Sequence, residues 1–168
     1  MSVNCIGVIL IMALLLVFFP AFFAESATAN EVLKHLEVRD GVIFPRGEKN
    51  EAYAQYFTGT SYLEMLTKER IGVGNVTFEP SCRNFWHIHH KGGQVLLVTG
   101  GRGWYQERGK PAQELHAGDV VNIAPGIKHW HGAARDSWFV HLAVEVPAEG
   151  AYNEWLEPVG EEEYGKLK

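Results

Sequence analysis

Residues 86–94 read WHIHHKGGQ, and residues 118–131 read GDVVNIAPGIKHWH. In the first stretch His87 and His89 are two positions apart, so both side chains face the same side of a β-strand. The turn formers HKGG follow, and Gln94 begins an apolar strand. We expect this turn to fold the second strand back beside the first, which would bring the Gln94 amide next to the two histidines.

The second stretch contributes one more donor. A turn at residues 124–126 (APG) ends a strand, and a histidine follows it. Two neighbouring imidazoles are costly to bury unless they share a proton, a partner or a metal, and three imidazoles with one amide oxygen suit a first-row divalent metal. Scattered surface histidines are the alternative, but they rarely combine an H-x-H pair, a nearby Gln and a turn leading to a further His. The sequence therefore predicts a metal site with the ligands His87, His89, Gln94 and His129.

Outside these stretches the chain consists of short segments rich in Val and aromatic residues, separated by Gly, Pro or polar turns. The segments are residues 71–80, 94–99, 103–108, 119–125 and 138–147. Strands repeated about every 8–12 residues are typical of an all-β sandwich or barrel. We expect one β-barrel domain over residues 50–150, and a C-terminal tail over 151–168 with a short helix at 160–167.

The composition fits a single globular domain. The chain has 168 residues, 46% of them hydrophobic and 21% charged. A net charge of −5 without any basic stripe argues against a nucleic-acid partner. Most of the eight histidines lie between His87 and His141. Cys82 has no cation at a fixed local spacing, so we expect a structural residue, with a reactive thiol as the alternative.

The N-terminus predicts export. Residues 6–23 are almost wholly apolar, no charged side chain occurs before Glu25, and small residues at 27–29 offer a cleavage pattern. We therefore expect a signal peptide over residues 1–29 and a periplasmic or secreted protein. An uncleaved membrane anchor is the main alternative because the apolar segment nears the length that spans a bilayer. Membrane contact is expected only through this segment, and a buried core helix is a third interpretation.

A cluster of aromatic residues predicts self-association. The aromatic side chains are Tyr53, Tyr56, Phe57 and Tyr62. They exceed what one small barrel can cover, and an open barrel also leaves edge strands to protect. We therefore expect a homodimer or a higher homo-oligomer.

The first stretch resembles the first motif of the cupin superfamily, G-x5-H-x-H-x3,4-E-x6-G. The match runs from His87 to Gly101. Gln94 replaces the usual Glu, and no Gly stands at the expected position before the histidine pair. The resemblance implies a single RmlC-like jelly-roll β-barrel.

The second stretch resembles the second cupin motif, G-x5-P-x-G-x2-H, from Gly118 to His129. Its proline, Pro125, is displaced by one residue, and Ala133 stands where Asn is often found. Together the motifs make the resemblance specific over residues 72–146.

Within the cupins the chain is similar to single-domain members labelled carboxymuconolactone-decarboxylase-like, which include bacterial manganese-dependent hydroxynitrile lyases. Those lyases use two His of the first motif, a Gln in place of Glu, and the His that opens H-W-H-G-A. The resemblance thus implies the same four metal ligands predicted above, with Mn(II) as the metal and Fe(II), Ni(II) or Zn(II) as alternatives. A further active-site histidine of the lyases matches His141. This chain has four residues between His89 and Gln94, where the lyases have three.

Three functions follow as hypotheses. The first is a metal-dependent lyase or proton-transfer enzyme for a small-molecule substrate, in which His131 and His141 are the catalytic acid/base groups, because an imidazole exchanges protons near neutral pH. The second is a metal-dependent dioxygenase, and the third is a non-catalytic binding module. The neutral Gln94 amide is expected to leave the metal charge uncompensated, which strengthens Lewis acidity and weakens metal binding.

Replacing His129 by Ala should remove a ligand and leave two imidazoles and an amide. We expect metal content per chain and nearly all activity to be lost while the fold survives, because the barrel is held by its apolar strands. Elemental analysis and circular dichroism measure the two effects. Full metal content in the variant would show that the site lies elsewhere.

Overall fold

The computed structural model describes residues 43–167 of the chain, so the predicted signal peptide, residues 1–29, lies outside the described residues. Among the described residues no helix is long and apolar enough to cross a membrane. The strands are β1 (Glu48–Lys49), β2 (Phe57–Thr58), β3 (Ser61–Thr67), β4 (Val73–Phe78), β5 (Arg83–Asn84), β6 (His87–His90), β7 (Gln94–Glu107), β8 (Gln113–His116), β9 (Val120–Ile123), β10 (Lys128–Ala133), β11 (Phe139–Glu145) and β12 (Tyr152–Trp155). The helical turns are η1 (Glu51–Tyr56) and α2 (Glu161–Tyr164).

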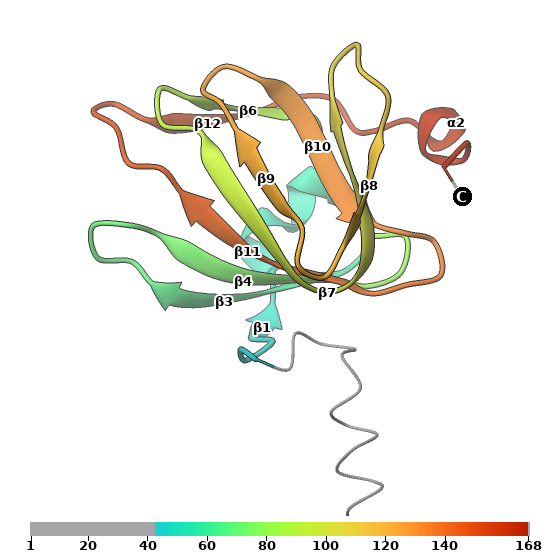
Figure 1. Cartoon of the computed structure of the whole chain (residues 1–168), viewed down its shortest axis with the longest axis horizontal. Coiled ribbons are helices and arrows are strands. Elements are labelled where there is room, and N and C mark those ends of the chain that lie inside the picture. Colours follow the sequence, from blue (N-terminus) through green and yellow to red (C-terminus); the bar gives the residue numbers. More distant parts are fainter. Residues whose placement is uncertain (1–42, 168) are drawn as a thin grey trace, which may run out of the picture. The chain divides into compact units, whose positions relative to one another are not determined.

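These strands form two antiparallel layers that curl into a barrel (Figure 1). The first layer has the order β1-β3-β4-β11-β7-β9. In the second, β10 pairs with β7, β6 and β5, while β12 extends β6 and β8 pairs with β7. The all-β barrel expected from the strand spacing is confirmed, and so is the jelly-roll form that the resemblance implied. Its interior holds the inward-facing apolar residues of both layers, among them Phe78, Leu96, Val98, Ile123 and Phe139.

Strand β7 belongs to both layers, and this corrects one expectation. Residues 94–99 and 103–108 were expected to be separate strands, but the structure joins them in one strand that bends at its central glycines. Its first half pairs with β11 and β9, and its second half pairs with β10 and β8. Gly101 has φ +71°, and a Cβ there would lie 1.8 Å from the Trp138 carbonyl oxygen. The glycines therefore let the strand change layers without ending it.

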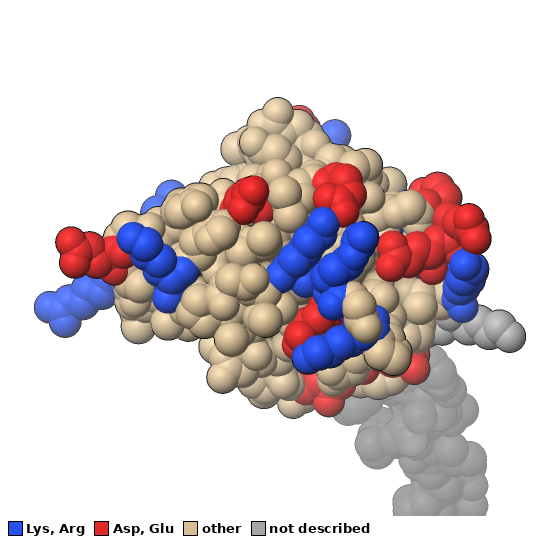
Figure 2. Space-filling model, turned by 90° about the horizontal axis from the view of Figure 1, so that it is seen from above, with Lys and Arg blue, Asp and Glu red and all other residues tan. Residues whose placement is uncertain are grey.

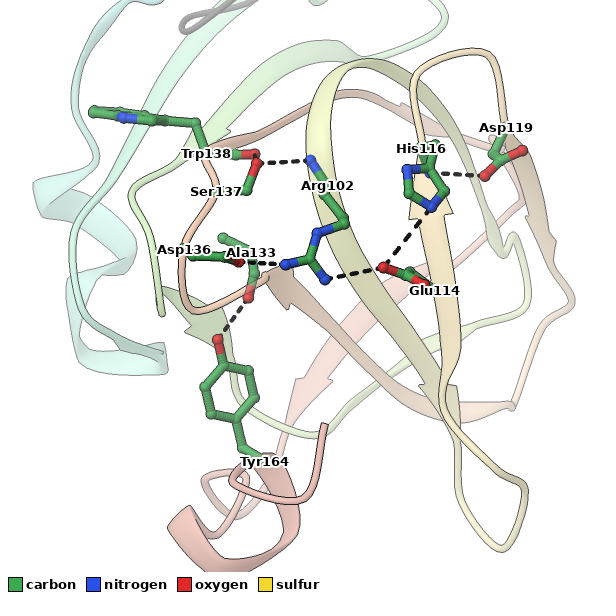
Figure 3. Close-up of polar contacts among 9 residues, drawn as sticks. All are labelled: Arg102, Glu114, His116, Asp119, Ala133, Asp136, Ser137, Trp138 and Tyr164. Atoms are coloured by element: carbon green, nitrogen blue, oxygen red, sulfur yellow. Dashed lines mark hydrogen bonds and ion pairs between the residues drawn. The ribbon is translucent and has the colours of Figure 1, made fainter. Parts of the chain in front are cut away.

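Hydrogen bonds and ion pairs of Arg102 hold this bend against neighbouring segments (Figure 3). Its backbone N–H donates to the Trp138 carbonyl oxygen at 3.0 Å and lies 3.1 Å from the Ser137 hydroxyl. Its guanidinium bridges two carboxylates, those of Glu114, at 2.9 Å, and Asp136. The bend is thus tied both to β8 and to the loop that leads into β11.

The connection from β6 to β7 differs from the expected hairpin. The two strands do not pair, since β6 lies between β10 and β12 while β7 begins in the opposite layer. The turn uses left-handed backbone at Lys91 (φ +69°) and Gly93 (φ +83°). A Cβ at Gly92 would lie 1.9 Å from a backbone oxygen, that of Val146. The turn therefore crosses from one layer to the other, and Gln94 faces the histidine pair from the opposite layer.

The C-terminal tail packs against the second layer through α2. This helix is shorter than the one expected at 160–167. Gly165 caps its C-terminal end, where the Gly165 backbone N–H donates to the Glu161 carbonyl oxygen at 2.8 Å. The guanidinium of Arg83 stacks on the Tyr164 ring. The buried Tyr164 hydroxyl donates to the Ala133 carbonyl oxygen at 2.7 Å (Figure 3). This contact joins the tail to the end of β10.

The thiol of Cys82 lies within the core. Burial is the largest cause that raises its pKa to about 12, followed by the charge of Glu79. The thiol therefore stays protonated, which favours the structural interpretation over the reactive one.

The aromatic cluster of residues 53–62 packs partly within the chain. Tyr56 stacks on Trp155 with ring centroids 4.7 Å apart, and Tyr53 and Phe57 contact the same indole. The homo-oligomer therefore stays a prediction. Figure 2 shows acidic and basic side chains side by side on the face viewed, and ion pairs such as that of Lys128 with Glu157 link them.

Replacing Gly101 by Ala should destabilise the protein more than replacing Gly109. Both positions have positive φ, and an alanine there costs about 1–2 kcal/mol. Gly109 has nothing within 4 Å of an added Cβ, whereas Gly101 would also clash with backbone, so we expect about 3 kcal/mol or more for Gly101→Ala. Urea unfolding measures both variants. Equal losses would show that the bend does not depend on close backbone approach.

Candidate metal centre

Two neighbouring strands of the second layer bring three imidazoles together. The β-strand alternation places His87 and His89 of β6 on one face, and His129 of β10 pairs directly with His87 across the ladder. All three side chains are buried. One ring nitrogen from each lies within 4.8 Å of the others. The three histidines thus form a group that could hold a metal ion.

The backbone orients two of these rings. The Nδ1 of His87 lies 2.9 Å from the Phe85 carbonyl oxygen, and the Nδ1 of His129 lies 2.9 Å from the Ile127 carbonyl oxygen. A carbonyl only accepts, so each Nδ1 carries the proton and each Nε2 keeps a free lone pair. The His129 Nε2 is buried and has no hydrogen-bond partner in the described part of the chain. Such outer contacts typically orient a metal-binding histidine.

The carboxylate of Glu145 lies against the other two predicted ligands. Its Oε2 is 3.2 Å from His89 Nδ1, a charge contact rather than a well-aligned hydrogen bond. Its Oε1 accepts a hydrogen bond from Gln94 Nε2 at 2.7 Å. The amide nitrogen is thereby engaged, and the buried Gln94 Oε1 has no hydrogen-bond partner in the residues described.

Burial keeps the imidazoles of His87 and His129 neutral. It is the largest cause that lowers the pKa of His129 to about 4 and that of His87 well below its usual value, where the neighbouring histidines lower it further. Burial alone would raise the pKa of Glu145, but the contacts with His89 and Gln94 outweigh it and lower that pKa. The site therefore presents the neutral nitrogens of His87 and His129 beside the ionised carboxylate of Glu145.

The donor set fits a divalent metal. Ring nitrogens whose other nitrogen is already bonded, together with a buried amide oxygen lacking a partner, are the groups that a borderline cation binds. Without a ligand each would be a buried polar atom with an uncompensated desolvation cost. His87, His89, His129 and Gln94 could supply four positions.

A second pair of buried histidines lies beside this group. His131 and His141 meet edge to face with ring centroids 4.8 Å apart, and the His87 ring is 5.7 Å from His131. Asn84 fixes His131: its Oδ1 accepts the His131 backbone N–H and its Nδ2 donates to Nε2, each at 2.9 Å. His131 therefore carries its proton on Nδ1, which has no hydrogen-bond partner among the described residues.

His141 has no hydrogen-bond partner at either ring nitrogen within the described residues. Burial lowers its pKa to about 3 and also lowers the pKa of His131, on which the charge of His141 acts next. Both rings are thus neutral at neutral pH, and His141 keeps one ring nitrogen with a free lone pair.

Both groups of histidines open onto one cavity of about 470 Å³. Its wall includes His87, His89, Gln94, His131 and His141, together with apolar residues such as Leu63, Met65, Val76 and Val146. The two layers therefore line a mostly apolar pocket that also carries polar groups, as is typical of small-molecule sites.

Comparison with known proteins supports this description. The cupin domain family matches residues 74–145. A curated (R)-mandelonitrile lyase of Granulicella tundricola is 43% identical over 115 residues, which is 66% of this chain and 87% of that protein. The chain belongs to the cupin family.

Solved structures agree with that assignment. A cupin-like protein of Thermotoga maritima superposes on this cupin with a TM-score of 0.69 and 46% identity, over 74% of this chain and 95% of that one. A structure described as a predicted oxalate decarboxylase from the same organism has a TM-score of 0.57, at 18% identity, over 66% of this chain and 98% of that one. The latter likeness shows the fold alone.

The structure of this cupin brings five of the six predicted site residues to the wall of one cavity, with His129 grouped beside His87 and His89, and it adds three residues. Asn84, Glu145 and Trp155 contact the histidines, with Trp155 stacked on His87 at 4.7 Å between ring centroids. Glu145 shares the inward face of its strand with His141. Apart from His141, the other residues on this face are apolar. An acidic residue among them was the sequence signal that could have identified Glu145.

Proposed function

We propose that this cupin is a metal-dependent lyase that splits a small cyanohydrin with an apolar or aromatic substituent into an aldehyde and hydrogen cyanide. The observation that carries the proposal is the pair of neutral histidines, His131 and His141, which line the same cavity as His87 and His89 of the three-histidine group. The likeness to a mandelonitrile lyase over most of that protein supports it.

The metal would be held by His87, His89 and His129 through Nε2 and by the amide oxygen of Gln94. Manganese(II) is the proposed ion, and the same donors accept Fe(II), Ni(II) or Zn(II). A divalent ion there supplies a Lewis acid that stabilises negative charge on oxygen or on the departing cyanide.

His141 is the proposed base. Its ring is neutral and unpartnered, so a nitrogen can accept the proton of the substrate hydroxyl. As that proton leaves, the oxygen forms the carbonyl double bond, and the bond from the carbinol carbon to the nitrile carbon breaks with its electron pair on cyanide. The imidazolium then returns the proton to cyanide, and the atoms balance as aldehyde plus hydrogen cyanide.

His131 is the proposed hydrogen-bond donor to the reacting group. Because Asn84 donates to its Nε2, the ring presents an Nδ1–H. Such a donor, fixed before the reaction begins, stabilises developing negative charge without reorganisation. The apolar part of the cavity wall suits a hydrocarbon or phenyl substituent.

Cleavage of mandelonitrile tests the proposal. Wild-type protein loaded with Mn(II) should release benzaldehyde, and His141→Gln should lower kcat about 100-fold or more because the base is lost. Metal content should not change, since His141 is not among the proposed ligands. Benzaldehyde absorbance and elemental analysis measure the two quantities.

His116→Gln is the matched control, because His116 is 60% exposed and lies on β8 outside the cavity. It should keep wild-type activity. A fully metal-loaded wild type that leaves cyanohydrins intact would contradict the lyase, and oxygen uptake with a phenolic or diketone substrate would favour a dioxygenase.

A further inference from the structure

Gln94 stands where the first cupin motif has a Glu, so the predicted ligand set lacks that negative charge. The structure nevertheless places another carboxylate, that of Glu145, beside the ligands. Glu145 is at the end of β11, and Gln94 is at the start of β7, directly opposite in the ladder. One carboxylate oxygen binds the Gln94 amide and the other contacts the His89 ring. Each oxygen of Glu145 therefore meets a different predicted ligand.

We infer that Glu145 is a positioning residue of the metal centre: its carboxylate turns the Gln94 oxygen and the His89 Nε2 toward the metal and supplies the negative charge that the ligands lack. This inference rests on the metal centre of the proposed function. It assigns Glu145 no direct contact with metal or substrate.

Hydrogen-bond donors and acceptors determine how Gln94 and His89 are oriented. A carboxylate offers only acceptors, so the group facing it from Gln94 must be the NH₂ and the atom facing it from His89 must be an N–H. The opposite ends, Gln94 Oε1 and His89 Nε2, are then free of protons. Both are buried and lack a hydrogen-bond partner in the described residues. A single acidic side chain thus decides which end of two others faces the site.

The negative charge of Glu145 lies close to the predicted metal ligands. A Glu at position 94 would hold its charge in direct contact with the ion, whereas Glu145 holds it one hydrogen bond away, 2.7 Å beyond the amide nitrogen. The charge still offsets the ion electrostatically in a half-buried site. The neutral amide is therefore accompanied by a nearby anion, which modifies the sequence-based expectation of an uncompensated metal charge. A Gln94→Glu change alone would instead bring two carboxylates together.

An amide at position 145 cannot perform the same role. Glu145→Gln offers one acceptor and one NH₂, so either His89 or Gln94 meets a donor where it needs an acceptor. His89 then moves its proton to Nε2, or Gln94 turns its NH₂ toward the metal. Either change blocks one ligand atom.

Metal affinity of three variants tests the inference, with Mn²⁺ alone and Zn²⁺ alone as probes. Glu145→Gln should weaken binding about 10–100-fold. The double exchange Gln94→Glu/Glu145→Gln should restore it, because the new amide can donate to the carboxylate at 94 and accept from His89 with the net charge unchanged. The exchange also shows that position 145 tolerates an amide in a folded protein.

Glu154→Gln is the matched control. Glu154 is 45% exposed against 44% for Glu145, and it pairs with His90 Nε2 at 2.7 Å, a histidine outside the predicted ligand set. The same charge is lost without contact to a predicted ligand, so affinity should stay within about twofold. An equal loss in both single variants would reduce the effect to long-range charge and overturn the assigned positioning.

The ring of His89 gives a readout that needs no metal. In metal-free wild type, ¹⁵N NMR should show the proton on Nδ1 and the Gln94 amide hydrogen-bonded. One of these signatures should be lost in Glu145→Gln and regained in the exchange. Unchanged signatures, or Mn²⁺ affinity of Glu145→Gln within threefold of wild type, would overturn the inference. If wild-type protein binds neither ion, the proposed metal centre is wrong. The metal-free spectra would still decide whether Glu145 orients Gln94 and His89.

Discussion

The bend in β7 is the constraint on which the rest of the structure depends. One strand pairs with β11 in the first layer and with β10 in the second, and the side chains of the site lie on β7 itself, on those two partners or on β6 beside β10. Strands β10 and β11 carry His129, His131, His141 and Glu145. Because backbone hydrogen bonds fix the register on both sides of the bend, β7 sets how His141 and Glu145 on β11 lie relative to the histidines on β10.

The enclosed site concentrates polar groups that a core ordinarily excludes. Six polar side chains, His87, His89, Gln94, His129, His131 and His141, are all at most 5% exposed, and several of their atoms have no hydrogen-bond partner in the described part of the chain. Such burial is unfavourable for the protein alone and is retained where it serves a ligand or a reaction. Two apolar clusters, one between the layers and one around Trp130 and α2, supply the packing that offsets it.

The two groups of histidines differ in what holds them. Backbone carbonyls orient the rings of His87 and His129 and one carboxylate contacts His89, so each ring keeps one nitrogen free for another ligand. Among the described residues His141 has no hydrogen-bond partner at either ring nitrogen, and His131 is hydrogen-bonded to Asn84. Fixed rings suit ligands and a free neutral ring suits proton transfer, which is the division of roles in the proposed function.

The sequence by itself determined the fold class and the residue types of the site. The period of two put His87 and His89 on one face, and the glycine- and proline-rich turns marked the ends of most strands, because both are local properties of the backbone. Local pattern misread residues 94–107 as two strands, because glycine permits a bend as readily as an end. Only the tertiary structure decided that Gln94 faces the histidines from the opposite layer and that Glu145 stands between Gln94 and His89. That choice depends on which strands pair across long stretches of chain, a free-energy balance that no local pattern contains.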